Sequence, residues 1–245
     1  MLMSAIEGIR AVPSYPELAG RRVLITGLSP ELGVDIARAF AEHKARLVLQ
    51  VPRACAKMQA VAEMLSSSAL DLRLFDGPLP AGDALVAFAR AAATAFGGLD
   101  AVVNLIPLGQ GRLAADASLD DIETEVANRL LLPTVVSKIV VNRMRLTHTE
   151  GVVLNVAALP PGAGAIDRAV ATVTKSALVT MTRNDAREWA GEAIRFNAIA
   201  PQVAAPSEPG LAGETDMAAL ALYLTSGRGK ALSGHVFEAD TGRGL

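Results

Sequence analysis

An acid, a hydroxyl and a lysine that lie close together in this chain are of types that could move a proton. Asp167, Thr172 and Lys175 fall within a short stretch, where a lysine beside an acid or a hydroxyl could move a proton. An aliphatic hydroxyl is a much weaker proton donor than a phenol. The two tyrosines of the chain, Tyr15 and Tyr223, lie far from this stretch in sequence. The residues alone therefore indicate at most an unusual proton donor working with Lys175.

The cysteine and histidine content gives no support for a metal site. Cys55 is the only cysteine, which excludes an internal disulfide and a cysteine-rich metal centre. His43, His148 and His235 are far apart in sequence, which favours isolated surface or core histidines. We expect no bound metal.

Length and composition fit one α/β domain with a large core. The chain has 245 residues, 51% of them hydrophobic and only 4% aromatic, with a net charge of −2. No basic stripe points to nucleic acid or to an anionic membrane. Neither a signal peptide nor a bilayer-spanning run is evident, so we expect a cytoplasmic protein. We expect residues 1–17 to form an N-terminal extension and residues 18–245 the domain.

Short apolar runs alternate with Ala-rich helical segments along the chain, a pattern that predicts a doubly wound parallel sheet. The expected strands are 22–27, 47–51, 72–75, 101–106, 152–156, 194–199 and 235–239. The expected helices are 34–46, 54–66, 84–96, 119–144, 166–189 and 217–225. Gly97-Gly98 and Pro160-Pro161-Gly162 are typical chain breaks, and Pro133 could kink the helix over 119–144.

An ordered set of landmarks runs through these elements. They are Thr26-Gly27 with Gly33, Phe96-Gly97-Gly98-Leu99-Asp100 before a strand ending in Asn104, Asn128, Lys175-Ser-Ala-Leu178 and Ile194-Arg-Phe-Asn-Ala-Ile-Ala-Pro201. In order and spacing over about residues 18–242, the chain resembles the short-chain dehydrogenase/reductase family. The resemblance implies an α/β fold: a single-domain, Rossmann-like, doubly wound parallel sheet with helices on both faces.

The resemblance also implies a site at the carboxyl ends of the strands. Members of the family bind a nicotinamide dinucleotide there, with its pyrophosphate at a glycine-rich turn and a helix N-terminus. A Tyr-x-x-x-Lys pair, a serine and an asparagine then handle the proton. The matching positions are Thr26, Gly27, Gly33, Asp76 and Asn104 for the cofactor, and Asn128 and Lys175 for catalysis.

Two catalytic positions of the family carry the wrong residue. The tyrosine position, four residues before Lys175, is Ala171, and the serine position is Ala158. These positions are 13 residues apart, the usual family spacing, so a slipped alignment does not explain the loss. Alanine has no proton to give, and positioned acid–base catalysis contributes about 10²–10⁴ in rate. We therefore expect this chain alone to be inactive, with Asn128 and Lys175 as remnants or as purely structural residues.

The cofactor positions are altered as well. Glu31 replaces the middle glycine of the turn, and its carboxylate would face the pyrophosphate. Pro107 adds bulk where the family has a glycine, and no acid ends the second strand to bind a ribose, although Arg53 could meet a 2′-phosphate. The segment after Pro201 that would cover a substrate is short. We expect no cofactor bound by this chain, or NAD(P) if any is bound.

These losses favour a catalytically inactive subunit that assembles with an active relative, as in a hetero-oligomeric NAD(P)-dependent alcohol dehydrogenase. An enzyme acting on hydroxyacyl-CoA compounds is one such setting. The helices near 119–144 and 166–189 would form the hetero- or homo-oligomer contact, through a small apolar face of Ala169, Val173, Ala177 and Thr180. Alternatively, this face packs on the chain's own sheet. One alternative function is an active oxidoreductase whose unusual proton donor is Asp167, Thr172 or the substrate itself, acting with Lys175. The other is a dinucleotide-sensing module.

Overall fold

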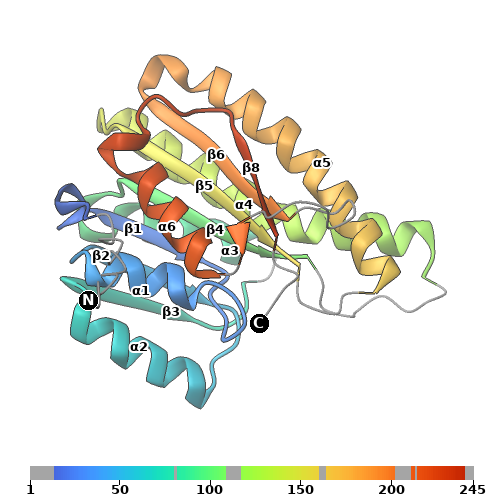
Figure 1. Cartoon of the computed structure of the whole chain (residues 1–245), viewed down its shortest axis with the longest axis horizontal. Coiled ribbons are helices and arrows are strands. Elements are labelled where there is room, and N and C mark those ends of the chain that lie inside the picture. The colour runs from blue at the N-terminus through green and yellow to red at the C-terminus, as the bar shows by residue number, and fades with distance from the viewer. Residues whose placement is uncertain are drawn as a thin grey trace, which may run out of the picture.

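The structure is a computed structural model that describes residues 14–79, 82–108, 117–159, 164–201, 211–212 and 214–240. Its strands are β1 (Arg22–Thr26), β2 (Arg46–Val51), β3 (Asp71–Asp76), β4 (Ala101–Pro107), β5 (Gly151–Ala158), β6 (Ile194–Pro201), β7 (Leu211–Ala212) and β8 (Val236–Asp240). All are parallel and form one sheet in the order β3-β2-β1-β4-β5-β6-β8-β7. The chain thus winds outward from β1 in both directions, and the expected Rossmann-like fold is confirmed (Figure 1).

In the part of the chain that the structure describes, six α-helices cover the two faces of this sheet. They are α1 (Val34–Glu42), α2 (Ala56–Ser68), α3 (Asp83–Thr94), α4 (Leu119–Leu146), α5 (Ala165–Glu188) and α6 (Glu214–Thr225). Buried side chains of α1, α2 and α6 pack on one face, and those of α3, α4 and the end of α5 pack on the other (Figure 1). The central strands read as continuous apolar runs because they are buried on both faces.

Local signals in the sequence explain several helix boundaries. Ser118 and Asp121 form a capping box at the start of α4, each side chain bonding the main chain of the other residue. Pro133 lies inside α4 without ending it. The helix expected over 34–46 ends at Glu42, because Lys44 adopts a left-handed φ of 58° and Arg46 already belongs to β2.

Other differences from the sequence-based expectations are small. The strand β7 was not predicted, because two residues are too few to show the alternation of apolar and polar side chains that marks a strand. The helix expected over 84–96 ends at Thr94, and Phe96 turns the chain at a φ of 53°. Pro160-Pro161-Gly162 lies outside the described residues. Tyr15 is buried against the core, so packing begins before the expected domain boundary at residue 18.

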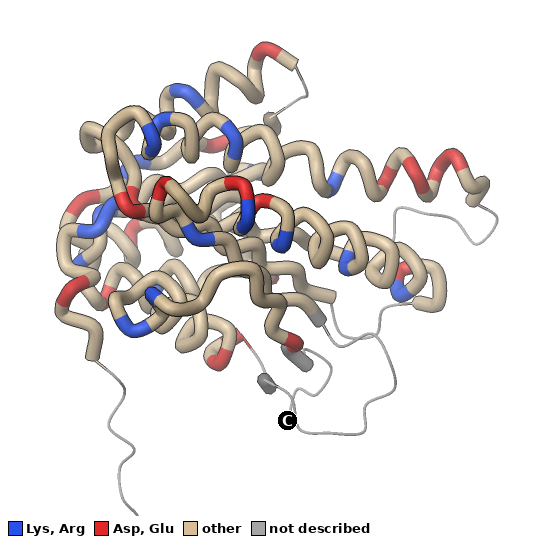
Figure 2. Tube along the Cα trace, turned by 90° about the horizontal axis from the view of Figure 1, so that it is seen from above, with Lys and Arg blue, Asp and Glu red and all other residues tan. Residues whose placement is uncertain are grey.

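Charged residues are interspersed along most of the chain (Figure 2). Within the described ranges, no helix has both the length and the apolarity needed to cross a membrane. The same residues contain no group of three or more His, Cys, Asp or Glu side chains placed to hold a metal ion.

Candidate functional site

A cleft of about 1000 Å³ opens at the carboxyl edge of the sheet. It lies between the β1–α1 turn, the ends of β2 and β4, and one side of α4, where a doubly wound sheet generally holds its ligand. Its walls carry the cations Arg53, Lys57 and Arg129 as well as the acids Glu31 and Glu125. Glu125 pairs with Arg129 at 2.8 Å, which leaves Arg53 and Lys57 as exposed cations on the far wall.

The glycines of the β1–α1 turn are required by the packing of the protein itself. Gly27 has a φ of 76°, and a Cβ there would lie 2.5 Å from the carbonyl oxygen of Leu105. Gly33 has a φ of 95°, and its Cβ would overlap a terminal methyl carbon of Leu105. Leu105 thus fills the space beside both glycines, so their presence does not depend on a bound cofactor.

Gly27→Ala is expected to lower the free energy of unfolding by about 2–3 kcal/mol, because it adds a clash with fixed backbone to the cost of a positive φ. Gly97→Ala is the matched control, since Gly97 has a similar φ of 83° but no atom within 4 Å of its Cβ position. It should cost about 1 kcal/mol. Urea denaturation of both variants checks this. Equal losses would show that Leu105 does not crowd the turn.

The main-chain N–H groups that could hold a phosphate at this turn already have partners. Gly27 N–H donates to Oε1 of Gln50 at 2.8 Å, and Leu28 N–H donates to the carbonyl of Gln50 at 3.0 Å. Ser29 and Leu32 bond each other's main chain at 3.0 and 3.3 Å. The turn is closed on itself, so a pyrophosphate would have to break existing hydrogen bonds to bind there.

The N-terminus of α1 is occupied by a carboxylate of the chain itself. Asp35 N–H donates to Oε1 of Glu214 at 2.8 Å, and the main chain of Gly33 also bonds this carboxylate. A helix N-terminus favours an anion through its free N–H groups and its dipole. Glu214, at the start of α6, therefore takes the place that the resemblance assigns to the cofactor's pyrophosphate. Sequence reasoning missed both Glu214 and Gln50.

Burial raises the pKa of Glu214 above its ordinary value, and the nearby Asp35 carboxylate adds to this rise, while main-chain hydrogen bonds oppose it. A raised pKa means that the folded state favours the protonated acid. The contribution of Glu214 to stability is therefore fully present below the ordinary glutamate pKa and is lost as pH rises through the raised pKa.

Glu214→Gln removes this titration while keeping the shape and an oxygen acceptor. Relative to wild type, the variant should gain stability as the pH is raised from about 4 to about 8. Urea denaturation across that range measures the difference. Asp216→Asn, an exposed acid in the same first turn of α6, should show no comparable trend. A difference between wild type and Glu214→Gln that does not change with pH would contradict the buried cap.

The side chains of Thr26 and Asn104 face the interior of the sheet. Thr26 Oγ1 donates to Oδ1 of Asn104 at 3.0 Å, and Asn104 Nδ2 donates to Ser137 Oγ at 3.0 Å and to Asn155 Oδ1 at 2.9 Å. Thr26 and Asn104 have no exposed surface. In this arrangement they join β1, β4, β5 and α4. Both residues were expected only as vestiges of the family's cofactor positions, and here their side chains bond other parts of the protein.

The remaining predicted residues lie apart from one another. Asn128 is exposed on α4 and lines the cleft, whereas Asp76 is exposed at the end of β3 and is not among the lining residues. Lys175 Nζ lies 2.6 Å from Oε1 of Glu238 on β8. This ion pair matches the structural interpretation of Lys175, in which the lysine has a protein partner.

The positions of the missing tyrosine and serine lie in apolar surroundings. Ala171 is completely buried and belongs to a small cluster with Ile106, Leu108, Ala157, Leu178 and Ala200. Ala158, at the end of β5, is partly buried and packs against the main core. Among the described residues, this corner offers no hydroxyl in the place where the family has two.

Comparison with known proteins places the chain among dehydrogenases. The family model described as short chain dehydrogenase matches residues 21–208. A peroxisomal 2,4-dienoyl-CoA reductase of Pongo abelii is 27% identical, over 98% of this chain and 91% of the relative. An uncharacterized oxidoreductase of Thermotoga maritima is 30% identical, over 74% of this chain and 71% of its own.

A solved structure shows the same fold. L-sorbose reductase of Gluconobacter frateurii, complexed with NADPH and L-sorbose, superposes with a TM-score of 0.73 at 20% identity, covering 93% of this chain and 98% of that one. The family match spans most of the chain and includes the β1–α1 turn, α4 and α5. This protein belongs to the short-chain dehydrogenase/reductase family of oxidoreductases.

Proposed function

We propose that this chain is a catalytically inactive subunit that supports an active relative in a hetero-oligomeric NAD(P)-dependent alcohol dehydrogenase. The observation that carries this proposal is the burial of Ala171 among apolar side chains. An enzyme that reduces a carbonyl must deliver a proton to the developing alkoxide, and alanine at this position has no proton to give. The acyl-CoA substrate in the name of one relative agrees with a partner that acts on CoA esters.

The residues present do not fit a nicotinamide dinucleotide. Members of the family hold the pyrophosphate at the β1–α1 turn, and here Glu214 bonds the N-terminus of α1 while Gln50 bonds the turn. Glu31 adds an exposed carboxylate to the wall of the cleft. A pyrophosphate would meet the two carboxylates and would have to displace Glu214, so we derive no step through this cofactor.

The outer face of α5 supports assembly with a partner. Ala169, Val173 and Thr180 are exposed and Ala177 is partly exposed, so this face does not pack on the chain's own sheet. Val173 leaves 51% of its surface accessible, and Leu131 on the neighbouring helix α4 leaves 39%. Small residues allow two helices to approach closely, and the exposed apolar atoms gain by burial.

Two alternatives keep a role for the cleft. In the first, the chain is an active oxidoreductase with an unusual proton donor such as Asp167 or Thr172, but the Thr172 hydroxyl already donates to the Arg168 carbonyl at 2.8 Å. In the second, the cleft of about 1000 Å³ with Arg53 and Lys57 senses a dinucleotide without turnover.

Calorimetric titration with NADH and NADPH separates these functions. The inactive-subunit proposal expects no saturable heat from folded protein. A micromolar dissociation constant, which corresponds to about −8 kcal/mol, would favour sensing. NAD(P)H oxidation that disappears in Lys175→Ala would instead establish the active alternative.

The partner is tested by co-expression with each catalytically complete short-chain dehydrogenase of the same genome. We expect a complex that resists salt and that is lost in Val173→Glu. Arg187→Glu, which changes an exposed residue near the end of the same helix, is the control and should leave the complex intact. A stable homodimer that binds none of these relatives would overturn the proposal.

A further inference from the structure

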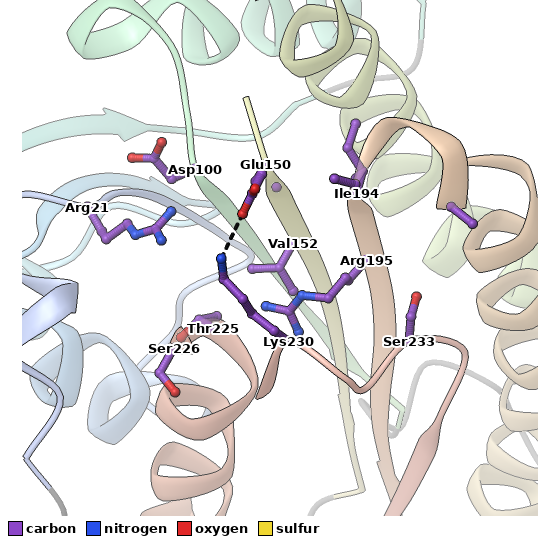
Figure 3. A pocket seen from close by; sticks show the side chains of 13 residues that line it. Arg21, Asp100, Glu150, Val152, Ile194, Arg195, Thr225, Ser226, Lys230 and Ser233 are labelled. Carbon is purple, nitrogen blue, oxygen red and sulfur yellow. Dashed lines mark hydrogen bonds and ion pairs between the residues drawn. The ribbon is translucent and has the colours of Figure 1, made fainter. Parts of the chain in front are cut away.

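A second pocket, of about 380 Å³, lies at the opposite edge of the sheet from the cleft, where the strands begin. Its lining comes from the starts of β1, β4, β5 and β6, the end of α6 and the loop before β8. We call it the amino-edge pocket. Figure 3 shows Arg21, Arg195 and Lys230 reaching into it from three separate segments, with Glu150 beside Lys230.

The positive charge of this pocket is not balanced by its acids. Both oxygens of Asp100 are occupied by Arg22: Oδ2 accepts from the main-chain N–H and from Nε at 2.9 Å each, and Oδ1 accepts from Nη2 at 2.6 Å. Among the residues that line the pocket, Glu150 is then the one acid left to balance Arg21, Arg195 and Lys230.

Arg195 is held with part of its guanidinium group free. Its Nη1 donates to the carbonyls of Gly229 at 2.7 Å and Leu232 at 3.3 Å, which fixes the side chain at the wall of the pocket. Its Nε and Nη2 have no hydrogen bond to any residue in the described ranges. Burial, together with the nearby charge of Arg21, lowers the pKa of Arg195, so an anion placed between the two guanidinium groups would relieve an unfavourable arrangement.

The one competing carboxylate is weakly held. Glu150 Oε2 lies 2.9 Å from Lys230 Nζ, but the two side chains leave 66% and 62% of their surface accessible. Exposed pairs of this kind contribute only about 0–1 kcal/mol. A ligand with more negative charge than a single carboxylate can therefore displace Glu150 and take over Lys230.

We propose that the amino-edge pocket binds the phosphate group of a small phosphorylated molecule through Arg21, Arg195 and Lys230. A phosphate dianion has several oxygen atoms that can accept hydrogen bonds from the fixed guanidinium group of Arg195 and from the mobile ammonium of Lys230. Its two negative charges also offset part of the charge of the three cations. The pocket exceeds a single phosphate in size, and Val152, Ala193 and Ile194 give it an apolar wall for the rest of such a molecule. This site is independent of the cofactor cleft and of the function proposed above.

The probe is inorganic phosphate, titrated into the full chain at constant ionic strength and followed by calorimetry and by NMR. Arg21→Gln should weaken binding about ten-fold through the loss of one charge. Glu150→Gln should tighten binding about five-fold, because it removes the competing carboxylate. General attraction of anions would change in the same two directions, so a cation outside the pocket must serve as the control.

Arg53→Gln is the matched control, because it removes a cation from the cleft at the other edge of the sheet. It should leave phosphate binding unchanged. If Arg53→Gln weakens binding while Arg21→Gln does not, the phosphate occupies the cleft and the proposal is wrong. It is equally overturned if wild type shows no phosphate binding, or if Glu150→Gln binds no more tightly than wild type.

Discussion

Replacing Asn104 by leucine is expected to lower the free energy of unfolding by about 3–5 kcal/mol. The side chain of Asn104 accepts from Thr26 and donates to Ser137 and Asn155, and all four residues are buried. Leucine would leave the three partner groups without a hydrogen bond in the interior of the sheet. Each orphaned buried group costs about 1–3 kcal/mol. Urea denaturation followed by circular dichroism measures the loss.

Asn142→Leu is the control for this variant. Asn142 lies on α4, and its Nδ2 donates to the carbonyl of Lys138 within the same helix. Its replacement should change stability by about 0.5 kcal/mol or less. Similar losses in the two variants would show that the buried network does not hold β1, β4 and β5 together. The result also bears on function, because a structural network explains why Asn104 persists in a chain that is expected not to bind a cofactor.

Most of the fold could be predicted from the sequence because the signals that define it are local. Apolar runs such as Val23–Ile25 and Val102–Val103 need no partner information to be recognised as buried strands, and their alternation with helices implies a parallel sheet. The ends of elements were less accurate. The left-handed turn at Lys44, which shortens α1, falls on a residue type that gives no turn signal.

The chemistry of the site was only partly predictable. The absence of tyrosine and serine is a matter of residue identity, so positions 171 and 158 could be found from spacing alone. The capping of α1 by Glu214 joins residues 179 apart in sequence. A glutamate at the start of a helix is an ordinary local signal, and nothing in the sequence says that it serves a different helix. The roles of Asn104 and Lys175 likewise depend on which side chains the fold brings to them.

Restoring the two family residues is the second experiment with a large expected effect. Ala171→Tyr combined with Ala158→Ser should not produce reduction of a carbonyl substrate with NADH or NADPH. Ala171 has no exposed surface and packs with Ile106 and Leu108, so the ring must displace buried side chains. Overpacking of this size is expected to lower the free energy of unfolding by about 3 kcal/mol.

Ala169→Tyr separates the cost of a buried ring from that of tyrosine in α5. Ala169 is exposed, so this change should alter stability by about 0.5 kcal/mol or less. Activity assays and thermal unfolding of the wild type, the double variant and Ala169→Tyr check the prediction. Turnover in the double variant would mean that cofactor and substrate still bind and that only the proton donor is missing. We expect the double variant to fold but to remain inactive. Gln50 bonds the β1–α1 turn and Glu214 bonds the N-terminus of α1, so the place where the cofactor would bind is taken by the protein's own side chains. Restoring the catalytic tyrosine and serine does not restore that place.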